Sequence, residues 1–176
     1  MEYLDEVDKN NNFTGKAFPK EEFHAKGFYY REVIGFVINE NNEVLLQKRA
    51  SNKKIKPNLW EVCYGHVSKG ERPEEAIIRE LLEEIGLNIK LEDLNFLSTE
   101  VTEEFYEGKY HNTFSYIYLI RTNKQVSEFK MQQEEVSDLK FISLEELKNL
   151  IKFSNELAFA DFKYMDKIIE KIEKII

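Results

Sequence analysis

The sequence contains one cysteine, Cys63, and only three prolines and seven glycines among its 176 residues. A single cysteine excludes an internal disulfide and a cysteine-rich zinc site. No apolar stretch of roughly 18 residues occurs, so we expect neither a membrane-spanning helix nor a membrane partner. The N-terminus is acidic and lacks the apolar core of a signal peptide, which makes a cytoplasmic location the expectation.

Basic residues are outnumbered as well. Lys and Arg together number 25 against 33 Asp and Glu, and the net charge is −8. A nucleic-acid-binding protein would need a basic face for the phosphates, so no nucleic-acid partner is expected. A phosphorylated small molecule remains compatible, because metal ions held by acidic side chains can reverse the local field.

No repeat, low-complexity tract or flexible linker divides the chain, which predicts a single domain over residues 1–176. Its first part, residues 1–27, is expected to be an extension that carries a hairpin with its turn at residues 8–12. Strands mixed with few helices indicate an α/β fold with a mixed sheet covered on its faces. The expected strands cover 28–39, 43–48, 60–64, 91–104, 113–121 and 138–142. The expected helices cover 73–85, 144–151 and, at the C-terminus, 158–176.

The C-terminal helix has an apolar stripe at helical spacing. The stripe consists of Phe162, Met165, Ile169, Ile172 and Ile176. Such a stripe is typical of core packing, with a subunit interface as the alternative. A homodimer is therefore left open.

The helix over residues 73–85 carries the residues that bear chemistry. It begins with a proline and is followed by Gly86, as expected for a helix start and a C-terminal cap. On a helical wheel, Ile77, Ile78, Leu81, Leu82 and Ile85 gather on one side, and Glu80, Glu83 and Glu84 gather on nearly the opposite side.

These three glutamates carry like charges at close helical spacing, which destabilises a helix. No Lys or Arg follows any of them by four residues. A solvated acidic face is the ordinary interpretation of such a run, but the missing partners favour an external cation. Carboxylate oxygens suit Mg²⁺ or Mn²⁺.

The residues around this helix extend the pattern. From Gly65 the sequence reads GHVSKGERPEEAIIRELLEEIGL. This run resembles the Nudix box, in which Gly, five residues, Glu and seven residues precede Arg-Glu-apolar-x-Glu-Glu-x-Gly-apolar. Every position is matched, by Gly65, Glu71, Arg79, Glu80, Leu81, Glu83, Glu84, Gly86 and Leu87.

The resemblance implies a Nudix-type α/β/α sandwich and a hydrolase that uses water to cleave a small-molecule diphosphate. It implies that Glu80, Glu83 and Glu84 are metal ligands and that Glu80 also orients the attacking water. The bare backbone at Gly65 lets the chain run tightly into the helix and could offer its carbonyl to the metal.

Three positions of the box are expected to be structural. Arg79 would pair with Glu71 or Glu75 and hold the loop on the helix, with direct phosphate binding as the alternative. Gly86 would cap the helix.

Many Nudix enzymes add a carboxylate from a loop outside the box. Glu135 is the candidate here together with Glu134, and Glu103 and Glu104 are second choices. The alternative for each is surface charge.

A second resemblance lies outside the box. The runs LDEVDKNNNFTG and LLQKRASNKKIKPNLW and the Gly65-His66 pair are similar to type I isopentenyl-diphosphate isomerases and to the Nudix hydrolases nearest them. Arg49 and Lys53 match basic residues of that group that contact the diphosphate, and surface charge is the alternative for both. The isomerases place a catalytic cysteine directly before Gly-His, where this chain has Tyr64.

Cys63 lies one residue earlier and should face the core, because neighbours on an extended segment point to opposite sides. The isomerases hold their metal ion with histidines. His24 and His66 could match two of these histidines, but Tyr30 occupies the position of a third. We expect polar or structural roles for both histidines, and a surface position for His111 with substrate contact as the alternative.

Three functions stay open: hydrolysis of an organic diphosphate, isomerisation of isopentenyl diphosphate, and ligand sensing without catalysis. The complete set of box glutamates disfavours a sensor, which need not retain them. The loops that choose the leaving group are not readable from the sequence.

Overall fold

The computed structural model describes residues 2–106, 108–158 and 164–176. Its strands are β1 (Tyr3–Val7), β2 (Phe13–Pro19), β3 (Tyr29–Ile38), β4 (Val44–Arg49), β5 (Trp60–Glu61), β6 (Cys63–His66), β7 (Leu94–Tyr106), β8 (Lys109–Arg121) and β9 (Val136–Ile142). Its α-helices are α1 (Lys20–Lys26), α2 (Pro73–Ile85), α3 (Leu144–Phe153) and α4 (Met165–Glu173), with short 3₁₀ turns at Leu91–Asp93 and Val126–Glu128. No helix in these ranges is long and apolar enough to cross a membrane.

The strands form one mixed sheet. β3 and β8 pair in parallel from Tyr29↔Asn112 to Ile38↔Arg121, whereas the other pairings are antiparallel. Both strands are rich in β-branched and aromatic residues, as a buried central pair requires. The mixed α/β sheet predicted from the sequence is confirmed.

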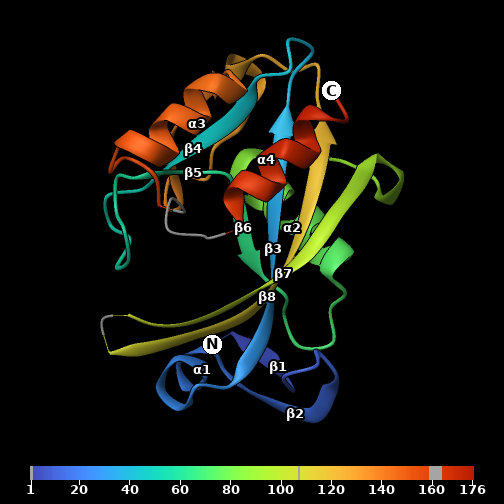
Figure 1. Cartoon of the computed structure of the whole chain (residues 1–176), viewed down its shortest axis with the longest axis vertical. Helices are drawn as coiled ribbons and strands as arrows, with labels where there is room; N and C mark the ends of the chain where they lie inside the picture. Colours follow the sequence, from blue (N-terminus) through green and yellow to red (C-terminus); the bar gives the residue numbers. More distant parts are fainter. Residues whose placement is uncertain (1, 107, 159–163) are drawn as a thin grey trace.

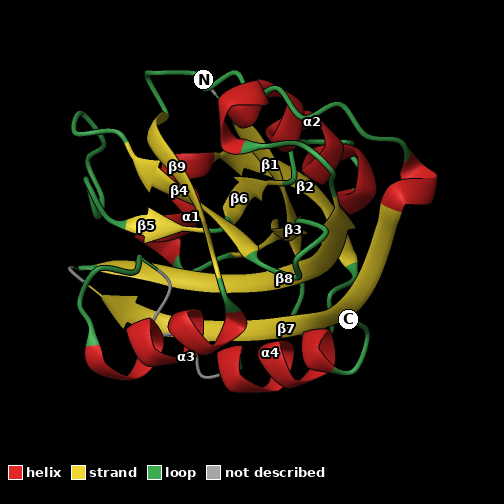
Figure 2. Ribbon diagram, turned by 90° about the horizontal axis from the view of Figure 1, so that it is seen from above, coloured by secondary structure: helices red, strands yellow, loops and turns green. Residues whose placement is uncertain are grey.

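Helices cover both faces of this sheet. Seen from above, α2 lies on one side, and α3 and α4 lie on the other (Figure 2). Alternate residues of β3 serve the two layers: Ile34 and Phe36 pack with the core under α3 and α4, whereas Val33 and Val37 pack with α2. This is the α/β/α sandwich expected from the sequence.

The sheet divides between β3 and β4. These two strands share only the pair Ile38↔Val44. Along the rest of their length β3 pairs with β6 and β8, whereas β4 pairs with β5 and β9. Figure 1 shows β4 diverging from β3 at an angle. The space between the two halves becomes the functional cavity.

The N-terminal hairpin is present as predicted. β1 and β2 pair across the turn, and they lie with α1 at one end of the molecule (Figure 1). The short helix α1 was not predicted. It ends at Gly27 in the left-handed conformation (φ 72°), and its one buried side chain, Phe23, packs against Tyr30.

The C-terminal helix is shorter than predicted, since α4 begins at Met165 and Ala158 lies in a turn. Met165, Ile169 and Ile172 of the stripe are buried in the core, so core packing is the correct interpretation for them. Ile176 is 37% exposed. The remaining member, Phe162, lies outside the described residues.

Candidate active site

A cavity of about 710 Å³ lies between the two halves of the sheet. α2 lines one wall, the loop after β4 lines another, and β3 with β6 lines the floor. Of the residues singled out in the sequence, it brings together Arg49, Lys53, Gly65, Arg79, Glu80, Glu83, Glu84, Glu104 and Glu135. Segments far apart in the chain thus meet at one site.

Glu80 lies directly over Gly65. A Cβ atom at Gly65 would come within 2.2 Å of the Glu80 Cγ atom, so any larger residue would displace this carboxylate. The sequence placed Gly65 in a loop that leads into the helix. The structure corrects this, because Gly65 belongs to β6 and pairs with Val33. Glycine is needed here for close approach.

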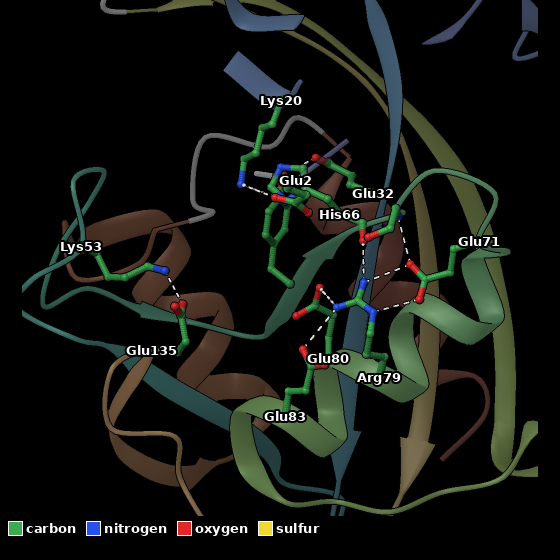
Figure 3. A network of polar contacts seen from close by, with 12 residues as sticks. Glu2, Lys20, Glu32, Lys53, His66, Glu71, Arg79, Glu80, Glu83 and Glu135 are labelled. Carbon is green, nitrogen blue, oxygen red and sulfur yellow. Dashed lines mark hydrogen bonds and ion pairs between the residues drawn. The ribbon is translucent and has the colours of Figure 1, made fainter. Parts of the chain in front are cut away.

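Arg79 holds the centre of an ionic network (Figure 3). Its Nε and Nη2 atoms donate to the two carboxylate oxygens of Glu71, at 2.8 and 3.0 Å, and Nη2 also donates to the His66 carbonyl at 3.0 Å. Nη1 donates to Glu80 at 2.8 Å and approaches Glu83 at 3.3 Å. The expectation that the helix glutamates lack a cationic partner is therefore wrong for Glu80 and Glu83. It considered only basic residues four positions after each glutamate, whereas Arg79 lies one position before Glu80 and four before Glu83.

The third glutamate corrects the helical wheel. Glu84 is 8% exposed and accepts a hydrogen bond from Gln47 Nε2 at 2.7 Å, whereas Leu82 of the predicted apolar face is 50% exposed. The buried side of α2 is therefore rotated toward Ala76 and Glu84. A helical wheel cannot predict this rotation, because it sorts residues only by polarity. The cavity buries the polar Glu84 on the same side of α2 as the apolar core.

Burial changes the acidity of these carboxyls. It raises the pKa of Glu84 to about 8 and that of Glu80 to about 7, although Arg79 opposes the shift at Glu80. Both groups thus lie in surroundings that penalise their negative charge. A bound cation would remove that penalty.

The donor set fits a divalent metal ion in its chemistry. Glu80, Glu83 and Glu84 supply hard oxygens from one helix, and the Gly65 backbone lies against Glu80. Their carboxylates are engaged with Arg79 and Gln47, and the described residues hold no group of three metal-ligating side chains gathered at one point. Metal binding would require these side chains to exchange partners.

The opposite wall carries a second ion pair. Lys53 Nζ contacts the Glu135 carboxylate, and both residues line the cavity (Figure 3). Arg49 is already engaged: Nη1 pairs with Glu61 at 2.7 Å, and Nε and Nη2 donate to backbone carbonyls of Ile55 and Lys56. Lys53 is therefore the more available of the two basic residues.

The other acidic candidates separate as well. Glu104 lines the cavity, Glu103 contacts the Tyr29 hydroxyl, and Glu134 is exposed. Glu104 and Glu135 are therefore the two candidates that line the cavity, and of these Glu135 is the one in a loop.

The comparisons with known proteins agree with this geometry. The NUDIX domain model matches residues 29–162. The chain belongs to the Nudix family. It is 33% identical over 151 residues to an uncharacterized Nudix hydrolase of Listeria monocytogenes, covering 85% of each chain.

Other relatives have more specific names. A prenyl-diphosphate phosphatase of Methanosarcina mazei is 30% identical, covering 85% of this chain and 84% of that protein. An isopentenyl-diphosphate Delta-isomerase of Photorhabdus laumondii is also 30% identical, covering 93% and 96%. A crystal structure from Deinococcus radiodurans superimposes with a TM-score of 0.71 at 18% identity, covering 97% and 99%. The predicted similarity to the isomerase-like branch of the Nudix family is confirmed.

Cys63 faces the core of this Nudix protein, as predicted, and does not line the cavity. Its side chain is buried in the core under α2, with Sγ 3.7 Å from Glu84 Oε2. Burial raises the pKa of this thiol. Tyr64, its neighbour on β6, lines the cavity instead.

All three histidines line the Nudix cavity. His66 stacks on Tyr30 at 5.6 Å between ring centroids, and its burial lowers its pKa. The His24 and His111 rings lie 4.9 Å apart. His111 is half-buried and lines the cavity, which agrees with the alternative of substrate contact.

Two carboxylates of the Nudix cavity were missed, Glu32 on β3 and Glu61 on β5. Glu61 pairs with Arg49, and Glu32 is only 2% exposed. A signal for Glu32 exists in the sequence, because it is a charged residue inside an apolar strand, in step with Ile34 and Phe36.

Proposed function

We propose that this protein hydrolyses a diphosphate linkage in an organic diphosphate and that it uses Mg²⁺ or Mn²⁺ to do so. The observation that carries the proposal is the cavity itself. At one end it gathers Glu80, Glu83 and Glu84 from α2, with Lys53 and Glu135 on the facing wall. Carboxylates for metal ions and a cation for phosphate are the groups that such a reaction requires.

In the proposed mechanism, each residue has a distinct task. The metal ion, when bound, would neutralise diphosphate oxygens and make a bound water more acidic. Glu80, held over Gly65, orients the water toward phosphorus and accepts its proton. Water forms a new P–O bond as the anhydride P–O bond breaks, and the phosphate leaving group departs with the bonding electrons.

The remaining site residues position these groups. Arg79 ties Glu71 and the backbone of β6 to α2, so that helix and strand keep their spacing. Lys53 contacts the diphosphate after it releases Glu135, which then becomes available as a further carboxylate. Arg49 shapes the loop around Ile55 and leaves direct phosphate contact to Lys53.

Isomerisation is the second candidate, favoured by the isopentenyl-diphosphate isomerase among the relatives. Allylic isomerisation needs an acid and a base on opposite sides of a hydrocarbon. Cys63 is buried in the core and does not line the cavity, and the position before Gly65 holds Tyr64, whose burial raises its pKa. Hydrolysis needs neither group.

The test is a panel of organic diphosphates, incubated with the protein and Mg²⁺ and followed by ³¹P NMR. We expect cleavage of at least one compound, loss of cleavage with EDTA, and recovery with Mn²⁺. Intact diphosphates throughout the panel would contradict the proposal. So would cleavage that EDTA leaves unchanged.

A further inference from the structure

Glu32 is a buried carboxylate that the proposed reaction does not use. It lies on β3, is 2% exposed, and lines the cavity floor. By strand alternation it lies on the same face as Ile34, the face covered by α3 and α4. A carboxylate buried there costs stability unless its charge is compensated, so its presence calls for an explanation.

The partners of Glu32 are neutral hydroxyl groups. Ser115 Oγ and Thr113 Oγ1 donate to Oε1 at 2.5 and 3.1 Å, and the Tyr64 hydroxyl donates to Oε2. Within the described residues, no lysine or arginine forms an ion pair with it. Hydroxyl donors favour the ionised carboxylate but supply no positive charge.

One acceptor position of Glu32 is left over. A carboxylate offers about four lone-pair positions, two on each oxygen. Oε1 accepts two hydrogen bonds and Oε2 accepts one. The remaining capacity lies on Oε2, beside Tyr64, which also lines the cavity.

Glu32 and the α2 glutamates mark different parts of the same cavity. On β6, Gly65 lies against Glu80 of α2, whereas Tyr64 turns to the other face of the sheet and meets Glu32. A diphosphate held at α2 would therefore direct its organic part past β6 toward Glu32. Ile34, Val62 and Met165 line the cavity beside this path.

We propose that Glu32 selects the substrate by accepting a hydrogen bond from a hydroxyl or amino group on its organic part. The preferred substrates are then diphosphates with a polar organic part, such as nucleoside diphosphates and their sugar derivatives, and not those of plain hydrocarbons. This inference rests on the proposed function for the place of the diphosphate. It adds the chemistry of the organic part of the substrate.

Glu32→Gln is the informative variant. Its amide oxygen can still accept from Ser115 and Thr113, and its amide nitrogen can donate to the Tyr64 hydroxyl, which is able to accept. The network is thus preserved while one position changes from acceptor to donor. Ser115→Ala is the matched control, because it removes a partner of Glu32 at a fully buried position.

The experiment measures thermal shifts in Mg²⁺ for the wild type and both variants. The probes are ADP, GDP and ADP-ribose as diphosphates with donor groups, and isopentenyl and geranyl diphosphate as hydrocarbon diphosphates. In the wild type we expect tighter binding of the first group. In Glu32→Gln we expect its affinity to fall about tenfold or more, since a hydrogen bond to a charged group is lost, with the hydrocarbon compounds unchanged. Ser115→Ala should lower the melting temperature of the free protein and leave the preference intact.

Two results would overturn the inference: equal weakening of both groups in Glu32→Gln, or no tighter binding of donor-bearing compounds by the wild type. Binding does not require turnover, so the thermal shifts judge the role of Glu32 even if ³¹P NMR detects no cleavage. Conversely, cleavage of hydrocarbon diphosphates alone would support the proposed hydrolysis and reject the role of Glu32.

Discussion

Glu83 is the most exposed of the three α2 glutamates, with 54% of its side chain accessible, and Arg79 approaches its carboxylate at 3.3 Å. Glu83→Gln should leave the melting temperature unchanged, because an exposed ion pair contributes little to stability. Turnover should fall by about two orders of magnitude or more, because the proposed metal site would lose a charged ligand. Glu170→Gln on α4, another exposed carboxylate, is the control for both measurements. Normal turnover in Glu83→Gln would remove this residue from the metal site.

Arg79 should act through architecture. Its bidentate contact with Glu71 is partly buried, so Arg79→Ala leaves that carboxylate without its cation. We expect a loss of about 1–3 kcal/mol in the free energy of unfolding together with a loss of activity. Arg72→Ala, which breaks the exposed pair with Glu75, should cost far less. A stable Arg79→Ala protein without diphosphate affinity would show instead that Arg79 binds phosphate.

Single residues show where sequence reasoning succeeds and where it fails. The sequence predicted that Arg79 pairs with Glu71 or Glu75 and that Cys63 faces the core. Arg79 pairs with Glu71, and Cys63 is buried in the core. The contact of Arg79 with Glu80 was not predicted, because only positions four residues after each glutamate were considered and Arg79 directly precedes Glu80. Glu32 was missed because a charge in an apolar strand acquires meaning only when the cavity beside it is known.

Among the elements, α2 was predicted to the residue, because Pro73 and Gly86 mark its ends. Gly86 has φ 65°, the left-handed conformation that favours glycine at this position. The division of the sheet between β3 and β4 was not predictable, since it depends on long-range pairing with β6, β8 and β9. That division creates the cavity. The contacts between side chains across the cavity were therefore not predictable from the sequence either.

The approach of β6 to α2 gives a prediction at this scale. Gly65→Ala would place a Cβ atom 2.2 Å from Glu80 and push this carboxylate out of position. We expect activity to fall by about 100-fold, as for a displacement of about 1 Å at a catalytic group. Gly35→Ala is the control: its Cβ would meet Ile77 of the same helix at 2.8 Å, away from the glutamates. It should lower stability with a much smaller loss of activity per folded molecule, and equal loss in the two variants would refute the specific role of Gly65.

At the scale of the whole molecule, the C-terminal stripe closes the core over β3 and β8, so it no longer argues for a subunit interface. A homodimer stays a prediction without support from that feature. The N-terminal segment contributes side chains to the site, because Glu2, Lys20 and His24 all line the cavity. The predicted extension thus forms part of the cavity wall.

The choice between hydrolase and isomerase also belongs to the whole molecule. Cys63→Ala should retain most activity against the true substrate, because this thiol is buried in the core under α2 and does not line the cavity. Isopentenyl diphosphate incubated with the protein and Mg²⁺ in D₂O should take up no deuterium. Deuterium uptake that disappears in Cys63→Ala would restore the isomerase assignment.

The central claim is that water attacks phosphorus at the α2 end of the cavity, and oxygen isotope transfer tests it most directly. A diphosphate that the protein cleaves with Mg²⁺ is incubated in H₂¹⁸O, and the products are analysed by mass spectrometry. We expect one ¹⁸O atom in a phosphate-bearing product, and no labelled product from the Glu83→Gln protein. Cleavage that places ¹⁸O in the organic alcohol, or labelled phosphate formed equally well by Glu83→Gln, would contradict the account.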